Sequence, residues 1–189
     1  MPEIIARSPV NPEFPRVIEI QRLRGVEDFP FDLSPTPEEA AALARLMEAR
    51  AVRKLRFRGR LFHAPESAWR LEGELGATVV QTCVVTLEPV TTRIDAPVRR
   101  LFSPHAAPAT EIDFEAEEED EAEPLGSSID LGLVAIEALA LALPAYPRLD
   151  GAELGPLARS APPGVAPLAD ADLQPFAALA ALRDRAPES

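Results

Sequence analysis

Three long runs of alternating apolar and polar residues occupy the middle of the chain and constrain its fold more than any other feature. In residues 51–62, AVRKLRFRGRLF, apolar and basic positions take opposite faces of a strand, because strand side chains alternate with a period of two. Residues 69–83 and 90–102 show the same period, and short turns join the three runs. They predict an antiparallel meander with one buried face. The residues expected on that face are Leu55, Phe57, Gly59, Leu61, Trp69, Leu71, Leu75, Ala77, Val79, Cys83, Val90, Ile94, Val98 and Phe102.

A helix is expected before the meander, after a weakly alternating strand at residues 15–20. Thr36 can cap its N-terminus, Pro37 suits the first helical position, and Glu39 completes a capping box. The apolar positions that follow recur at helical spacing to about Arg50.

Two further helices are expected after the meander. The first begins at residue 128, has Asp130 at its N-terminus and ends at Pro144. It is apolar almost all round, so it should be buried against the sheet. The second covers residues 175–185, and its apolar face consists of Phe176, Leu179 and Leu182.

These elements predict an α+β fold: a curved antiparallel meander covered by two or three helices, with closure into a barrel as an open alternative. The 189 residues suit a single domain. It would consist of residues 1–103 with the first strand, first helix and meander, an acidic flexible insert at 104–127, and residues 128–189 with the buried helix, a proline-rich segment and the C-terminal helix.

Charge is distributed unevenly along the chain, whose net charge is −12. Residues 1–110 carry 15 basic and 14 acidic side chains, whereas residues 111–189 carry 4 and 17. Nine acids fall within residues 111–123, and such like charges repel and resist packing. The insert is therefore read as a solvated linker. The alternatives are a polyanionic surface for a basic protein, or a brake that covers a basic face until RNA displaces it.

A row of basic side chains on the first strand of the meander is the candidate binding site. Lys54, Arg56, Arg58 and Arg60 lie about 6.5–7 Å apart, a spacing close to that of phosphates along a nucleic-acid strand. Arg99 and Arg100 could extend this row. The competing interpretation is a solvated face on which Glu72 and Glu74 of the next strand pair with the arginines. Phe62 is the only aromatic residue expected on this face, so support for reading single-stranded bases is weak.

Cys83 is the only cysteine and invites a chemical role. A zinc site needs about four ligands, commonly in CxxC pairs, but the position three residues on is Thr86. Because Cys83 shares parity with Val79 and Leu75, it is expected to be a buried small hydrophobe, with a reactive thiol or a metal ligand as the minor alternatives. A single cysteine excludes an internal disulfide and indicates a reducing compartment.

Catalytic signatures are absent from the sequence: no phosphate-binding glycine loop, HExxH or GxSxG motif occurs. No enzyme activity, cofactor or metal is therefore expected. The longest apolar run, residues 131–143, is shorter than the roughly 20 residues of a membrane span, and the N-terminus lacks a signal-peptide pattern. The protein is expected to be cytoplasmic with no membrane partner.

Three stretches resemble the YceD family, the large ribosomal RNA subunit accumulation proteins. They are TCVVTLEPVTTRIDAPVRRLFSP at residues 82–104, IDLGLVAIEALALALPAYPR at 129–148 and QPFAALAALRDR at 174–185. The positions that carry this signature are Cys83, Leu87, Glu88, Pro89, Asp130, Leu131, Leu143, Pro144, Pro175, Phe176, Leu179 and Leu182.

The resemblance implies a ribosome biogenesis factor needed for processing or accumulation of large-subunit (23S) rRNA. Its partner would be that rRNA or a pre-ribosomal particle, or a basic large-subunit ribosomal protein; the alternative is an acidic chaperone for such a protein without RNA contact. Many family members carry CxxC in the first stretch and another cysteine after the second. Here Thr86 replaces the second cysteine, and residues 149–153 contain none.

Overall fold

The structure, a computed structural model, describes residues 11–106 and 122–153. The chain divides into two compact units, residues 1–149 and 150–189, and the fold described below is that of the first. Its strands are β1 (Val17–Glu19), β2 (Asp28–Leu33), β3 (Ala51–His63), β4 (Trp69–Thr82), β5 (Pro89–Ser103), β6 (Ala122–Pro124) and β7 (Ser128–Asp130). Its helices are α1 (Pro37–Leu46) and α2 (Leu131–Ala142), with 3-10 turns at Ile20–Leu23 and Pro65–Ser67.

The main sheet has the strand order β2-β3-β4-β5-β6, and β1 pairs with β7 in a separate two-stranded ribbon. Strands β2 to β5 are antiparallel neighbours, which confirms the predicted meander, while β6 runs parallel to β5. The α+β fold class is therefore correct. The suggested closure into a barrel is wrong, because among the described strands β2 and β6 do not pair and the sheet stays open.

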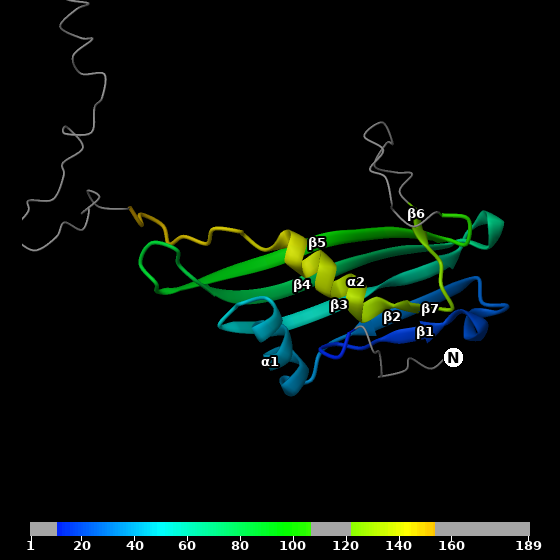
Figure 1. The fold of residues 1–189 in the computed structure, drawn as a ribbon, viewed down its shortest axis with the longest axis horizontal. Coiled ribbons are helices and arrows are strands. Elements are labelled where there is room, and N and C mark those ends of the chain that lie inside the picture. The colour runs from blue at the N-terminus through cyan, green and yellow to red at the C-terminus, as the bar shows by residue number, and fades with distance from the viewer. Residues whose placement is uncertain (1–10, 107–121, 154–189) are drawn as a thin grey trace, which may run out of the picture. The chain divides into compact units, whose positions relative to one another are not determined.

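One face of the sheet is covered, and α2 crosses it in front of the long strands (Figure 1). Every other residue of β4 from Trp69 to Val79 except Gly73 is buried there, as the alternation predicted. Gly59 and Gly73 lie opposite each other on this face, where a Cβ on Gly59 would meet Phe31 and one on Gly73 would meet Phe57. The two glycines thus make room for the rings of Phe31 and Phe57, which pack with centroids 4.9 Å apart.

Strand β3 contains a β-bulge that the sequence analysis did not foresee. The register with β4 shifts between Arg53 and Arg56, and Lys54 has a φ of 50°. Val52 and Leu55 are both buried, so two exposed residues separate them instead of one. Arg53 pairs with Thr78 and continues the outward row. The prediction that Lys54 occupies a regular place in that row is therefore wrong, because Lys54 lies in the bulge.

Helix α1 begins where the sequence predicted, whereas α2 begins at Leu131 and not at residue 128, with Asp130 at its N-terminus as expected. At α1 the Thr36 hydroxyl accepts from the Glu39 backbone N–H while the Glu39 carboxylate accepts from the Thr36 N–H, so the capping box is formed. The helix ends at Leu46 rather than near Arg50, and Glu48 follows with a φ of 51°. Helix α2 is capped by Asp130 and buries one side, but Leu141 in its last turn remains 80% exposed. The expectation of complete burial is thus wrong for that turn.

A network at the start of α2 ties the N-terminal segment to both helices. Asp130 accepts hydrogen bonds from the backbone of Gly132 and Arg16 and from the fully buried side chain of Asn11. Arg16 also forms a bidentate pair with Glu39 of α1, with both N–O distances at 2.8 Å. That guanidinium holds the pKa of Glu39 below its usual value. The network fixes residues 11–16 against the start of α2 and against α1.

Parts of the expected organisation lie outside the described residues. They include the helix at 175–185 and residues 107–121 of the acidic insert. Residues 122–124 at the end of the predicted insert form β6, and residues 128–130 form β7 before the helix starts. Among the helices that the structure describes, none is long and apolar enough to cross a membrane.

Candidate nucleic-acid interface

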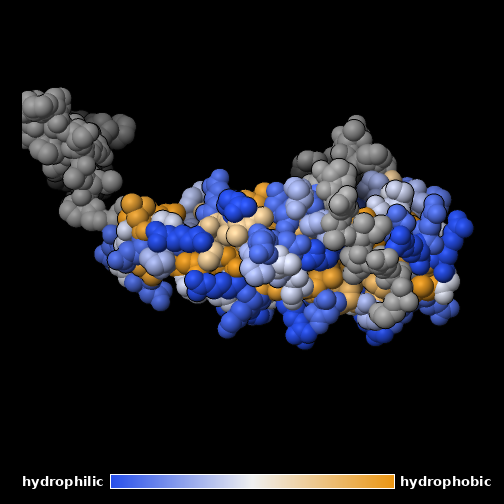
Figure 2. Space-filling view, turned by 90° about the horizontal axis from the view of Figure 1, so that it is seen from below, coloured by the Kyte–Doolittle hydropathy of each residue, from blue (hydrophilic) through white to orange (hydrophobic). Residues whose placement is uncertain are grey.

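The uncovered side of the main sheet, here called the open face, carries most of the charged side chains of the long strands. A strand residue belongs to the open face when it alternates with the buried positions and so points away from α2. In Figure 2 hydrophilic groups project along the margins of the described unit, with hydrophobic surface between them. The charged residues of the open face are Asp28, Asp32, Arg53, Arg56, Arg58, Arg60, Arg70, Glu72, Glu74, Arg93, Asp95 and Arg99.

Three arginines of the predicted row form ion pairs. Arg58 donates to Glu74 of β4 at 2.8 Å, as the solvated-face interpretation expected. Arg56 and Arg60 pair instead with two acids of β2, Asp32 and Asp28. All three guanidinium side chains remain more than half exposed, with 56% the lowest value. These pairs neutralise the row locally without removing it from solvent.

The acids of β2 were missed because that strand was not predicted from the sequence. Its six residues, DFPFDL, contain a proline that weakens a strand prediction. The alternation of buried and outward positions is nevertheless present, and it aligns Asp32 beside Arg58 and Asp28 beside Phe62. Arg56 reaches Asp32 diagonally and holds the pKa of its carboxyl below the usual range.

Four other cations are available on or beside the open face. Arg53, Lys54, Arg70 and Arg99 are exposed and make no ion pair with any residue that the structure describes. Arg53 and Lys54 lie at the β-bulge of β3, whereas Arg70 and Arg99 lie at the opposite end of the sheet. Of this set, Lys54 and Arg99 were predicted from the sequence as binding residues, and Arg53 and Arg70 were not. The adjacent basic pair Arg53-Lys54, which interrupts strict alternation, was the signal for the bulge.

Arg100 does not belong to the open face. It is paired in register with Leu71, whose side chain is fully buried on the covered side, so alternation turns Arg100 to that side. There it pairs with Glu123 of β6 at 2.8 Å. Burial raises the pKa of Glu123, and the Arg100 charge opposes that rise. Arg100 therefore anchors the end of the insert, and its suggested place beside Arg99 is wrong.

The open face is basic overall although the chain is acidic. It holds seven arginines (53, 56, 58, 60, 70, 93 and 99) against five carboxylates (28, 32, 72, 74 and 95), a net charge of +2, and Lys54 in the bulge adds one more. The whole chain carries −12. Acidic residues elsewhere leave this face as a distinct basic surface, which suits a polyanion.

The turn that contains Cys83 is largely exposed, and Cys83 is its buried residue. Cys83 is fully buried like Val79 and Leu75, which confirms the predicted burial, but it lies in the turn after β4 and outside the apolar core cluster. The Thr86 side chain and the Thr86 backbone N–H, 3.4 Å from the sulfur, donate to it and lower the pKa of the thiol to about 6. The sulfur therefore acts as a hydrogen-bond acceptor that holds the turn, a role beyond that of a small hydrophobe.

Two of the signature stretches lie side by side at this end of the sheet. The Val84 N–H donates to the Pro147 carbonyl at 3.0 Å, and Gln81 Nε2 donates to the Pro144 carbonyl at 3.2 Å. Leu87, with a φ of 62°, closes the turn by donating to the Cys83 carbonyl. The signature residues of both stretches thus build one local structure.

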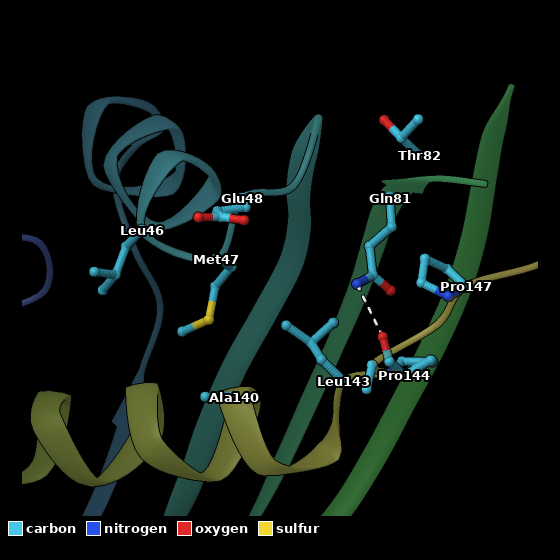
Figure 3. A pocket seen from close by; sticks show the side chains of 10 residues that line it. Leu46, Met47, Glu48, Gln81, Thr82, Ala140, Leu143, Pro144 and Pro147 are labelled. Carbon is cyan, nitrogen blue, oxygen red and sulfur yellow. Dashed lines mark hydrogen bonds between the residues drawn. The ribbon is translucent and has the colours of Figure 1, made fainter. Parts of the chain in front are cut away.

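A groove of about 480 Å³ with both apolar and polar lining opens beside this turn, between the end of α1, the end of β4 and the end of α2 (Figure 3). Leu46, Met47, Leu143 and Pro144 supply apolar lining. Gln81 enters the groove from β4, and its buried Oε1 has no hydrogen-bond partner among the described residues. Such a groove can hold an apolar side chain of a partner together with one hydrogen-bond donor to Gln81 Oε1.

Metal binding finds no support in the described part of the chain, where no group of three or more histidine, cysteine or acidic side chains could hold an ion. Cys83 stands without a second cysteine, and His63 and His105 lie at the far end of the sheet from it.

A family model described as "Large ribosomal RNA subunit accumulation protein YceD" matches residues 71–183, more than half of the chain. No curated protein matches the chain, and neither does any solved structure. The matched region begins in β4 and includes the Cys83 turn, β5, β6, β7 and α2.

Proposed function

The chain belongs to the YceD family of large ribosomal RNA subunit accumulation proteins, and on this premise we propose that it binds large-subunit rRNA through the open face of its sheet. It acts during ribosome assembly in the cytoplasm, on the rRNA itself or on a pre-ribosomal particle. The family description names accumulation of an RNA and no reaction, so binding is the simplest activity that serves it.

The exposed cations without ion-pair partners carry this proposal. A phosphate that approaches Arg53, Lys54, Arg70 or Arg99 meets a charge that no described carboxylate already neutralises. Arginine suits phosphate because its planar donors can bind two oxygens at once. Arg56, Arg58 and Arg60 lie between these cations, and their side chains remain exposed although they form ion pairs. Each can therefore release its carboxylate and bind a phosphate instead.

The decisive experiment removes these four charges together and measures binding to a large-subunit rRNA fragment across a salt series. Each lost phosphate contact reduces the magnitude of the slope of log K against log salt by slightly less than one, so the variant Arg53→Ala/Lys54→Ala/Arg70→Ala/Arg99→Ala should lose about three to four units of slope. Affinity at low salt should fall more than tenfold.

A matched control removes four exposed basic side chains elsewhere: Arg22→Ala/Arg24→Ala/Arg45→Ala/Arg148→Ala. It changes the net charge by the same amount and should keep the wild-type slope. If the two quadruple variants behave alike, the open face does not bind RNA and a general charge effect accounts for the affinity.

The second candidate function is that of an adaptor for a basic large-subunit ribosomal protein. Exposed apolar residues around the groove favour it: Leu46 is 47%, Leu141 80% and Tyr146 77% exposed. The net charge of −12 complements a basic partner. The variant Leu46→Ser/Leu141→Ser/Tyr146→Ser should abolish capture of that protein and leave RNA binding intact, and deletion of residues 111–121 should weaken the capture by removing acidic charge. Unchanged capture by both variants would rule out the adaptor.

A further inference from the structure

We infer that the open face binds double-stranded RNA, with backbone phosphates at its two ends and a groove of the duplex over its centre. This inference rests on the proposed function and adds the structural class of the RNA. It follows from the arrangement of charge, from the distance between the two ends and from the aromatic content of the face.

Charge on the open face is divided into two ends and a centre. One end holds Arg70 and Arg99, and the other holds Arg53 with Lys54. Between them, Arg58 is held by Glu74 and Arg56 by Asp32. Cations that make no ion pair with a described residue therefore lie at the two ends, whereas the central guanidinium groups already donate to carboxylates.

A single strand lying along the sheet would meet repulsion from Glu74 in the centre and from Glu72 beside Arg99. Its phosphates would follow one another about every 6–7 Å, the spacing of alternate residues on a strand, so some would fall beside Glu72 and Glu74. Glu72 makes no ion pair with a described residue, although Arg60 and Arg99 flank it in register. A duplex avoids this repulsion, because its backbones approach a flat surface only at intervals and a groove lies between them.

The distance between the two ends fits a duplex. Arg70 and Thr78, which pairs with Arg53, are eight residues apart on β4, or about 27 Å at the rise of an antiparallel strand. This is close to one turn of an A-form helix. Proteins that bind double-stranded RNA by its shape contact phosphates and sugars at successive grooves along one side of the helix. The two ends can therefore contact the backbone one turn apart.

The open face lacks the stacking surface that single-stranded RNA requires. Among the described residues assigned to this face, Phe62 is the one aromatic side chain, and it is half-buried. The Arg60 guanidinium lies over its ring, 5.8 Å from the centroid, and limits access to it. Proteins that bind single strands gain much of their affinity from bases stacked on exposed aromatic rings.

The test compares wild-type binding to a duplex of about 16 base pairs with binding to one of its strands alone, chosen to be unstructured. We expect at least tenfold tighter binding to the duplex. Glu74→Gln, in the centre of the face, should raise affinity for the single strand several-fold and leave the duplex unchanged, whereas the control Glu38→Gln, on α1, should change neither. Equal or tighter binding of the single strand by the wild-type protein would overturn the inference.

A series of duplex lengths tests the spacing. Affinity should rise sharply once the duplex reaches about ten base pairs and can contact both ends. The variants Arg53→Ala/Lys54→Ala and Arg70→Ala/Arg99→Ala should each remove that rise. Their affinity for long duplexes should equal the affinity of the wild type for short ones. A smooth dependence on length in the wild type would overturn the inference. The proposed function fails separately, if removal of all four charges leaves binding of both RNA forms unchanged.

Discussion

The two faces of the same sheet hold their side chains by different means. On the covered face, Phe57, Leu61 and Leu71 are fully buried and fixed by contact with neighbours on every side. On the open face, Arg58 and Glu74 are 60% and 70% exposed and fixed by one ion pair in water. Burial contributes far more free energy than an exposed pair, so the covered face stabilises the fold while the open face remains free to bind a ligand.

Substitution of a covered residue should have the largest effect on stability. Leu71→Ala leaves a cavity at a fully buried position of the central strand β4 and should lower the free energy of unfolding by about 2–5 kcal/mol. Thr78→Ala, on the open face of the same strand, should change it by less than about 0.5 kcal/mol. Urea denaturation of both variants measures the difference, and similar losses would contradict the division between the faces.

A single methyl group at the start of α2 should have the next largest effect. A Cβ on Gly132 would lie 1.7 Å from the Phe14 carbonyl oxygen, so Gly132→Ala must push the N-terminal segment off the helix. We expect a loss of about 1–3 kcal/mol in the free energy of unfolding, measured by thermal and urea denaturation. Gly126→Ala is the control, because a Cβ there meets nothing closer than 3.9 Å. A neutral Gly132→Ala would show that the segment does not pack as described.

The open-face ion pair should have a small effect. A double-mutant cycle of Arg58→Ala and Glu74→Ala should give a coupling of about 0.2–1 kcal/mol that falls as salt is added. Denaturation at low and high ionic strength measures it. A coupling energy well above this range and insensitive to salt would mean that the pair is shielded from water. That result would contradict the description of the open face as solvated.

The Cys83 turn is compared through the pKa of its thiol, and the effect of a substitution there is expected in a titration. Thr86→Val removes the hydroxyl donor and should raise the pKa of Cys83 from about 6 toward that of an ordinary thiol. Thiolate ultraviolet absorbance against pH measures the change, and Thr91→Val on exposed β5 serves as control.

The same turn gives stability a dependence on pH with a defined sign. A thiol whose pKa is lower in the folded state stabilises the fold fully above its unfolded pKa, and this contribution is lost as pH falls toward about 6. The stability of wild type relative to Cys83→Ala should therefore rise with pH from about 6 to the ordinary thiol range near 9. A constant difference would show that the sulfur does not carry charge in the folded protein.

Much of the fold could be predicted from the sequence because strict alternation leaves few choices. The period of two in β3, β4 and β5 specified the meander and its buried side, and Thr36 and Asp130 marked the helix starts. Strands β6 and β7 could not be predicted in this way. Each has three residues, too few to show a period, and their pairing with β5 and β1 depends on tertiary contacts.

The binding surface was less predictable than the fold, because its charges act in pairs across strands. The register of β2 decides that Arg56 and Arg60 meet acids, and a bulge decides that Arg53 joins the outward row. Neither can be read from one strand alone. Alternation along β5 places Arg99 on the open face. Its neighbour Arg100 pairs in register with Leu71, which faces the core, so Arg100 points to the covered face.

The ribbon of β1 and β7 sets an order for folding during synthesis. Val17 pairs with Asp130, so the first strand has to wait for more than a hundred residues before its partner is made. The meander from β2 to β5 consists of neighbours in sequence and can form first, whereas closing so long a loop comes late. Until α2 emerges, α1 is the only described helix that packs on the covered face, and the apolar side chains beneath α2 are open to solvent. A nascent chain halted before residue 131 would therefore expose an apolar sheet surface to chaperones, and α2 completes the core that the structure describes.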